Sequence, residues 1–231
     1  NVNNMVRLMW AKVGGAESYL VYRQEQGSSK WTLIDKTASE RLYYEDKTVV
    51  SNNTYKYAVA AEKGTVISVI GAGSVSHIFL ASPEFIKVEN TANGISLKWK
   101  FVGGAEKYEV YRKTDISKEW QLIETTTSLS YLDTDVLNGT TYFYTVKAFS
   151  GKTSSSYNTN ATIAFLEAPK FSSQEALEDG IMVKWQAVQG ATGYTIYRMH
   201  TDSEAKEWVE VASLNETLTY FKDTSAEGGN Y

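Results

Sequence analysis

Three tryptophans, Trp31, Trp120 and Trp208, are the residues of this chain best suited to contact a ligand. An indole ring exposed on a strand face can stack on a sugar or on another flat molecule. The alternative is that each ring covers a hydrophobic core from its own strand, and their recurrence at one register favours this alternative. Exposure of the rings distinguishes the two interpretations, because a buried ring offers no platform.

Catalytic and metal chemistry has few candidate residues. His77 and His200 are the only histidines of the 231 residues, so a histidine-based metal site or a Ser-His-Asp triad would require one of them. No Gly-x-Ser-x-Gly motif occurs, and the absence of cysteine excludes thiolate metal sites and disulfides. The acids are scattered rather than paired across a cleft. We therefore predict a non-enzyme with no catalytic residue, no metal site and no cofactor.

Two short motifs resemble ion-binding loops but fail on their spacing. Residues 133–139, DTDVLNG, begin like a calcium loop, yet Leu137 and Asn138 stand where an acid and then glycine are needed. Tyr144 occupies the position of the final glutamate. The Gly-Ala-Gly at 71–73 has no third glycine and no helix after it, so it does not predict phosphate binding. We expect residues 133–139 to be a turn between strands.

One unit of sequence occurs three times. MWAKVGGAESYLVYRQ begins at Met9, KWKFVGGAEKYEVYRK at Lys98 and KWQAVQGATGYTIYRM at Lys184. The tryptophans of the three copies, Trp10, Trp99 and Trp185, are 89 and 86 residues apart, which is the size of a small domain rather than of a solenoid repeat. Later features keep the register, including YKYAVAA from Tyr55 and YFYTVKA from Tyr142.

Each unit has the pattern of β-strands. In the second copy Ile95, Leu97 and Trp99 alternate with polar residues, which indicates one buried and one solvated face. The segments between such runs are rich in turn-forming residues, and no helical periodicity of useful length occurs. About seven short strands in about 90 residues predict an all-β sandwich. Arg112 follows the buried parity of Tyr108, so we expect its stem on apolar surface at the sandwich edge and its head in water.

This pattern resembles fibronectin type III domains, most closely those of Firmicutes surface and secreted proteins. It runs W-x-x-V-x-G-A-x-x-Y-x-V-Y-R, then W-x-x-I, Y-x-D and Y-x-Y-x-V-x-A. The resemblance implies that strands C and F pair within a sheet. It also implies structural core roles for the strand B tryptophans and for the corner tyrosines at the start of strand F, namely Trp10, Trp99, Trp185, Tyr55 and Tyr142. Tyr231 matches a third corner, although the spacing before it departs from the pattern.

The resemblance implies three tandem immunoglobulin-like (fibronectin type III) β-sandwiches, of which the first and last are incomplete. We assign residues 1–79 to a first repeat without strand A, 80–165 to a complete second repeat and 166–231 to a third repeat without strands F and G. We expect the chain to continue into further domains of a longer array.

Composition excludes some partners and leaves the compartment open. Lys+Arg 23 against Asp+Glu 27 gives a net charge of −4, without the basic footprint of a nucleic-acid binder. The longest uncharged run, residues 65–83, is interrupted by polar residues and glycines, so we expect no membrane insertion. A cysteine-free chain fits the cytosol and equally the surface of a Gram-positive bacterium.

The functional expectation is a non-catalytic extracellular array that acts as a spacer or adhesion module of a bacterial surface or secreted protein. Its partners would be a host or cell-wall protein or a glycan. The alternative is a carbohydrate-binding accessory region of a secreted glycoside hydrolase.

Overall fold

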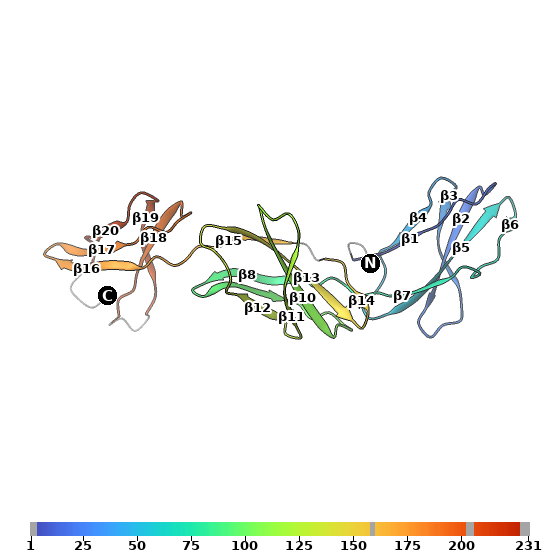
Figure 1. The fold of residues 1–231 in the computed structure, drawn as a ribbon, viewed down its shortest axis with the longest axis horizontal. Coiled ribbons are helices and arrows are strands. Elements are labelled where there is room, and N and C mark those ends of the chain that lie inside the picture. The colour runs from blue at the N-terminus through green and yellow to red at the C-terminus, as the bar shows by residue number, and fades with distance from the viewer. Residues whose placement is uncertain (1–3, 158–159, 202–205, 227–231) are drawn as a thin grey trace. The chain divides into compact units, whose positions relative to one another are not determined.

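The computed structural model describes residues 4–157, 160–201 and 206–226, and within them every regular element is a β-strand (Figure 1). No helix in this part of the chain is long and apolar enough to cross a membrane. The strands form paired sheets in successive segments, which confirms the predicted all-β class of tandem β-sandwiches. The predicted corner at Tyr231 lies outside the described residues.

The chain divides into two compact units. The first consists of Asn1–Val88, Leu97–Tyr131 and Phe143–Thr162, and the second of Glu89–Ser96, Leu132–Tyr142 and Ile163–Tyr231. Because this division passes through strands of the second repeat, it differs from the repeat boundaries near residues 80 and 166. Those boundaries remain predictions, and the names first, middle and third repeat refer to them below.

Two sheets form in the first repeat. One contains β1 (Val6–Met9) and β4 (Tyr43–Asp46), and the other has the order β3-β2-β5-β6 with β7 beside β5. The bounds of the second sheet's strands are Ser18–Glu25 for β2, Thr32–Ala38 for β3, Thr54–Lys63 for β5, Val66–Ile67 for β6 and Val75–Ile78 for β7. Val6 of β1 packs with Tyr55 and Tyr57 of β5 in a buried cluster, so the two sheets enclose a core.

The middle repeat has a larger pair of sheets. One has the order β12-β9-β8, and the other has the order β11-β10-β13-β14 with β15 beside β13. The first sheet is built of β8 (Phe85–Thr91), β9 (Gly94–Trp99) and β12 (Ser130–Asp133). The second is built of β10 (Lys107–Thr114), β11 (Gln121–Thr126), β13 (Thr141–Ser150), β14 (Thr153–Ser154) and β15 (Ala161–Ala164). β10 and β13 are neighbours, as the implied pairing of strands C and F requires.

The alternation predicted for the middle repeat is present on its strands. Ile95, Leu97 and Trp99 of β9 have no exposed surface, and Tyr108 and Val110 of β10 are buried as well. The Asp-Thr-Asp stretch at 133–135 leaves β12 and leads into the connection to β13. There the Asp133 carboxylate accepts a hydrogen bond from the Asp135 amide at 3.2 Å, which is typical of a turn.

In the described part of the chain, the third repeat has fewer strands than the other two. Its first sheet contains β16 (Phe171–Leu177), β17 (Gly180–Trp185) and β20 (Tyr220–Asp223), in the order β16-β17-β20. Its second sheet contains β18 (Gly193–Arg198) and β19 (Val209–Asn215). β18 corresponds to β2 and β10, which have β5 and β13 on their other edges. Within the described residues, no strand takes this place beside β18.

One aromatic pair recurs in all three repeats. The strand B tryptophan contacts a tyrosine nine positions later in the sequence, with ring centroids 5.6, 5.7 and 5.3 Å apart; the pairs are Trp10–Tyr19, Trp99–Tyr108 and Trp185–Tyr194. Trp99 is fully buried, Trp185 is 5% exposed and Trp10 is partly exposed. Each pair joins the strand before the glycine-containing turn to the strand after it, so the repeated motif that contains both residues serves the scaffold.

Candidate binding surfaces

The three candidate ligand-stacking tryptophans have different environments although they share a register. Each directly precedes a strand, Trp31 before β3, Trp120 before β11 and Trp208 before β19. Trp31 and Trp120 are partly buried, whereas Trp208 is 66% exposed. Register alone therefore does not decide which ring is available to a ligand.

Trp120 contacts side chains that project outward from its sheet. The Lys113 ammonium lies 4.9 Å from the indole centroid, and the Tyr157 ring stacks on the indole at 6.0 Å with an interplanar angle of 25°. Tyr157 also meets the edge of Tyr111 at 5.2 Å. Since Lys113 and Tyr111 alternate along β10 with the buried residues, Trp120 lies on the outer face of the sheet rather than in the core between the sheets.

Trp31 is covered by its own repeat to a similar degree. The Lys56 ammonium lies 5.9 Å from the ring centroid, and Lys56 alternates along β5 with the buried Tyr55 and Tyr57. The backbone at Gly71 also approaches the ring: a methyl group placed on Gly71 would lie 3.5 Å from the indole. Trp31 thus also lies on an outer sheet face, where Lys56 and the backbone at Gly71 cover part of the ring.

Trp208 lies beside an open hollow of the third repeat. Together with Tyr197, which is 53% exposed, it lines a shallow depression. Both rings also border a cavity of about 630 Å³ whose apolar wall includes Ile181, Val183 and Ile196. Trp208 is thus the most accessible ring of the series.

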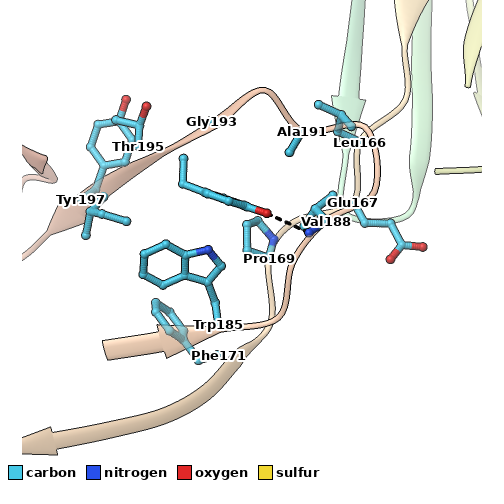
Figure 2. Close-up of a pocket in the computed structure, with 12 residues that line it drawn as sticks. Leu166, Glu167, Pro169, Phe171, Trp185, Val188, Ala191, Gly193, Thr195 and Tyr197 are labelled. Carbon is cyan, nitrogen blue, oxygen red and sulfur yellow. Dashed lines mark hydrogen bonds between the residues drawn. The ribbon is translucent and has the colours of Figure 1, made fainter. Parts of the chain in front are cut away.

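A second cavity of the third repeat, of about 410 Å³, lies over its tryptophan–tyrosine pair (Figure 2). Trp185 and Phe171 lie on one side in this view, and the Tyr194 hydroxyl accepts a hydrogen bond from the Val188 amide at 2.9 Å. In the middle repeat, Tyr144, Val146 and Ala148 of β13 are fully buried beside the equivalent strand β10. The cavity over Trp185 and Tyr194 therefore corresponds to apolar interior surface of the middle sandwich.

A buried acid of the first repeat, Asp46, is engaged in an internal network. Burial alone would raise the pKa of Asp46, but hydrogen bonds from Arg23, Thr48 and Tyr57 bring that pKa below its ordinary value. The Arg23 guanidinium lies 2.7 Å and the Tyr57 hydroxyl 2.8 Å from one carboxylate oxygen. Burial, followed by this hydrogen bond, raises the pKa of Tyr57. Asp46 is thus a charged structural acceptor with its lone pairs occupied.

The third repeat has a matching network. The Arg198 guanidinium binds the Asp223 carboxylate at 2.7 Å, and Ser225 donates to the same carboxylate through its amide at 2.9 Å and its hydroxyl at 2.7 Å. Burial would raise the pKa of Asp223, but these partners lower it overall. Arg23 and Arg198 match Arg112, for which the head group is expected in water. At these two matching positions the head group instead pairs with a buried acid.

The remaining side chains that could act in catalysis or bind a metal ion are not clustered in one site within the described residues. His77 is on β7, and burial lowers its pKa, while His200 follows β18. Within the residues that the structure describes, no group of three or more His, Cys, Asp and Glu side chains is placed to hold a metal ion.

Sequence reasoning missed one recurring polar contact. The hydroxyl of the strand C tyrosine accepts a hydrogen bond from the amide six residues upstream, at 2.8 to 3.0 Å, in the pairs Val13–Tyr19, Val102–Tyr108 and Val188–Tyr194. The constant V-x-G-A-x-x-Y spacing was the available signal. The strand F tyrosines make a similar contact: Tyr55 accepts from the Val50 amide at 2.9 Å and Tyr142 from the Leu137 amide at 2.7 Å. These contacts hold turns against strands.

Comparison with known proteins gives likeness at the level of architecture. No family model matches the chain. No curated protein matches it either. Among solved structures, the FN1–FN3 domains of chicken CNTN1 are 19% identical, cover 97% of this chain and 85% of that chain, and have a TM-score of 0.33. A segment of two fibronectin type III domains from chicken tenascin is 14% identical, covers 70% of this chain and 93% of that chain, and has a TM-score of 0.36. The chain's own strand pairing is that of tandem β-sandwiches.

Proposed function

We propose that this chain is a non-catalytic structural and interaction array, a spacer or adhesion module of an extracellular protein of a Gram-positive bacterium. The proposal rests on one observation, which is that the recurring residues make their contacts within the scaffold. In repeat after repeat the conspicuous aromatic and charged residues contact other parts of the scaffold, as Trp99 contacts Tyr108 and Arg23 contacts Asp46. A repeated unit that uses its distinctive residues for its own folding is suited to spacing and display.

The state of the acids supports a non-catalytic role. A general acid or base must reach a substrate proton, and a catalytic carboxylate is poised near the working pH. Asp46 and Asp223 have pKa values shifted in the opposite direction and are bound by arginine. The extracellular setting is supported by the resemblance of the repeat to bacterial surface domains.

The second candidate function, a carbohydrate-binding accessory region of a secreted glycoside hydrolase, is favoured by one observation. Trp208 is exposed and lies beside Tyr197 at an open depression, which is the arrangement a sugar ring can stack on. Partners under either function would be a host or cell-wall protein or a glycan.

A titration with neutral polysaccharides separates the two functions. A spacer is expected to show no binding tighter than millimolar to soluble cellulose, xylan or chitin fragments, measured by calorimetry on the full chain. Micromolar binding that disappears in Trp208→Ala or Trp120→Ala would replace the spacer by the accessory region. Release of reducing sugar from the same polysaccharides would overturn the non-catalytic assignment.

A further inference from the structure

The outer face of the middle repeat has a row of lysines and aromatic rings that the scaffold roles above do not explain. The buried residues of β10 and β13 leave Lys107, Lys113, Lys147 and Phe149 on the opposite parity, which faces outward. Trp120 and Tyr157 lie against the same surface. These six residues are called the lysine–aromatic face.

Each lysine of this face lies over an aromatic ring. Lys107 lies 5.0 Å from the Phe149 centroid, and Lys147 lies 5.5 Å from Phe149 and 5.0 Å from Tyr157. Tyr157 stacks on Trp120, over which Lys113 lies at 4.9 Å. The contacts therefore run without interruption from Lys107 through Phe149 and Lys147 to the stacked rings of Tyr157 and Trp120, and from there to Lys113.

The face is cationic although the chain is acidic overall. Lys107 is paired with Glu109 at 3.1 Å. Lys113 and Lys147 form no ion pair within the described part of the chain, so their charges are compensated only by ring faces, which do not neutralise them. Against a net charge of −4, this local excess of positive charge is complementary to an anionic partner.

The first repeat shows that the fold does not need this face. β2 and β5 form the same pair of strands there, and the positions that match Lys107, Lys113 and Lys147 are Ser18, Gln24 and Ala60. Glu62 stands at the position of Phe149 and pairs directly with Ser18. Lysine–aromatic pairs across strands add some stability to a sheet. Because the same sheet forms without them, stability alone does not account for three lysines on one face.

We propose that the lysine–aromatic face binds an acidic polysaccharide, with uronic-acid carboxylates at the lysines and the apolar faces of the sugar rings against Trp120 and Tyr157. Tyr157 is 43% exposed, which leaves ring surface for stacking. The interspersed cations and rings suit a chain molecule that carries a carboxylate on every ring-shaped unit. An acidic peptide would use the lysines but has no flat face for each ring.

This inference names a ligand class for the interaction role proposed above and rests on that role. Failure of this inference can be distinguished from failure of the proposed function, because a chain that binds no acidic glycan can still be a spacer. Conversely, hydrolysis of neutral polysaccharide by the chain would refute the non-catalytic role without bearing on the lysine–aromatic face.

The test is a calorimetric titration of the full chain with a galacturonic acid oligomer, beside a glucose oligomer of equal length and poly-glutamate. The key variant, Lys107→Ser with Lys113→Gln and Lys147→Ala, places the first repeat's residues in the middle repeat, so folding is expected to survive. Lys98→Gln is the matched control, since Lys98 is an exposed lysine of β9 on the other sheet. Melting curves of all variants confirm that they are folded.

We expect the galacturonate oligomer to bind and the glucose oligomer not to bind. The triple variant and Trp120→Ala should each weaken binding at least tenfold, and Lys98→Gln should not. Raising the salt to about 0.5 M should also weaken binding, because exposed charges are screened. Absence of galacturonate binding, or equal binding by the folded triple variant, would overturn the proposal. Equally tight poly-glutamate binding that is unaffected by Trp120→Ala would assign the face to acidic peptides instead.

Discussion

Replacing Trp99 tests the packing of the middle repeat most directly. The residue is fully buried and contacts Tyr108. A tryptophan side chain buries about 150–250 Å², which at about 25 cal/mol per Å² gives an upper value of about 4–6 kcal/mol. We therefore expect Trp99→Ala to lower the free energy of unfolding of the middle repeat by about 3–5 kcal/mol.

The indole nitrogen makes Trp99→Phe informative as well. Its N–H is buried, and within the described residues no group accepts a hydrogen bond from it. A buried donor without an acceptor costs about 1–3 kcal/mol, so phenylalanine removes this cost while losing a similar amount of packing. We expect the free energy of unfolding of Trp99→Phe to lie within about 1 kcal/mol of that of the unmodified chain, because the two terms nearly cancel.

Calorimetry measures these changes, and hydrogen exchange of β9 and β10 assigns the transition to the middle repeat. Trp208→Ala is the matched control, since its exposed ring predicts a change within about 0.5 kcal/mol. The packing argument is refuted if Trp99→Ala melts like the unmodified chain. The hydrogen-bond argument is refuted if Trp99→Phe is as destabilised as Trp99→Ala.

Three further predictions follow from the polar contacts and the open strand edge. Tyr142→Phe should cost about 1 kcal/mol by denaturant unfolding, since the Leu137 amide loses its acceptor, whereas the exposed Tyr220→Phe should be neutral. Asp46 has a lowered pKa when folded, so its stabilisation is present above about pH 4 and is lost as pH falls through the folded pKa; Asp46→Asn should flatten the acid side of the stability–pH curve. Amides of β18 should exchange faster than those of β10, and equal protection would contradict the uncovered edge.

Much of the scaffold was predictable because its signals are local. Period-two alternation identified Ile95, Leu97 and Trp99 as inward residues, and all three are fully buried. The three copies of the pattern place a tyrosine nine positions after each strand B tryptophan, so this spacing could be predicted from the sequence. These properties depend on neighbours within a few residues or on the repeat itself, so they are visible without coordinates.

The polar partners and the candidate sites were less predictable. The expectation of a solvated head group at Arg112 does not hold for the matching Arg23, whose side chain is 17% exposed and pairs with Asp46. The partner is 23 residues away in the sequence and in the other sheet, so no local pattern announces it. Lys147 likewise meets Tyr157 only because β13 and the segment after β14 lie on the same face.

The sequence by itself determined the all-β class, the repeat and the inward face of each strand, because alternation and turn composition act over short distances. Only the tertiary structure decided which tryptophans of one register are covered. Trp120 is contacted by Tyr157 and Lys113, while Trp208 remains exposed beside Tyr197. Exposure is a property of what the rest of the chain places over a ring, and three rings at the same register of the repeat can therefore have different surroundings.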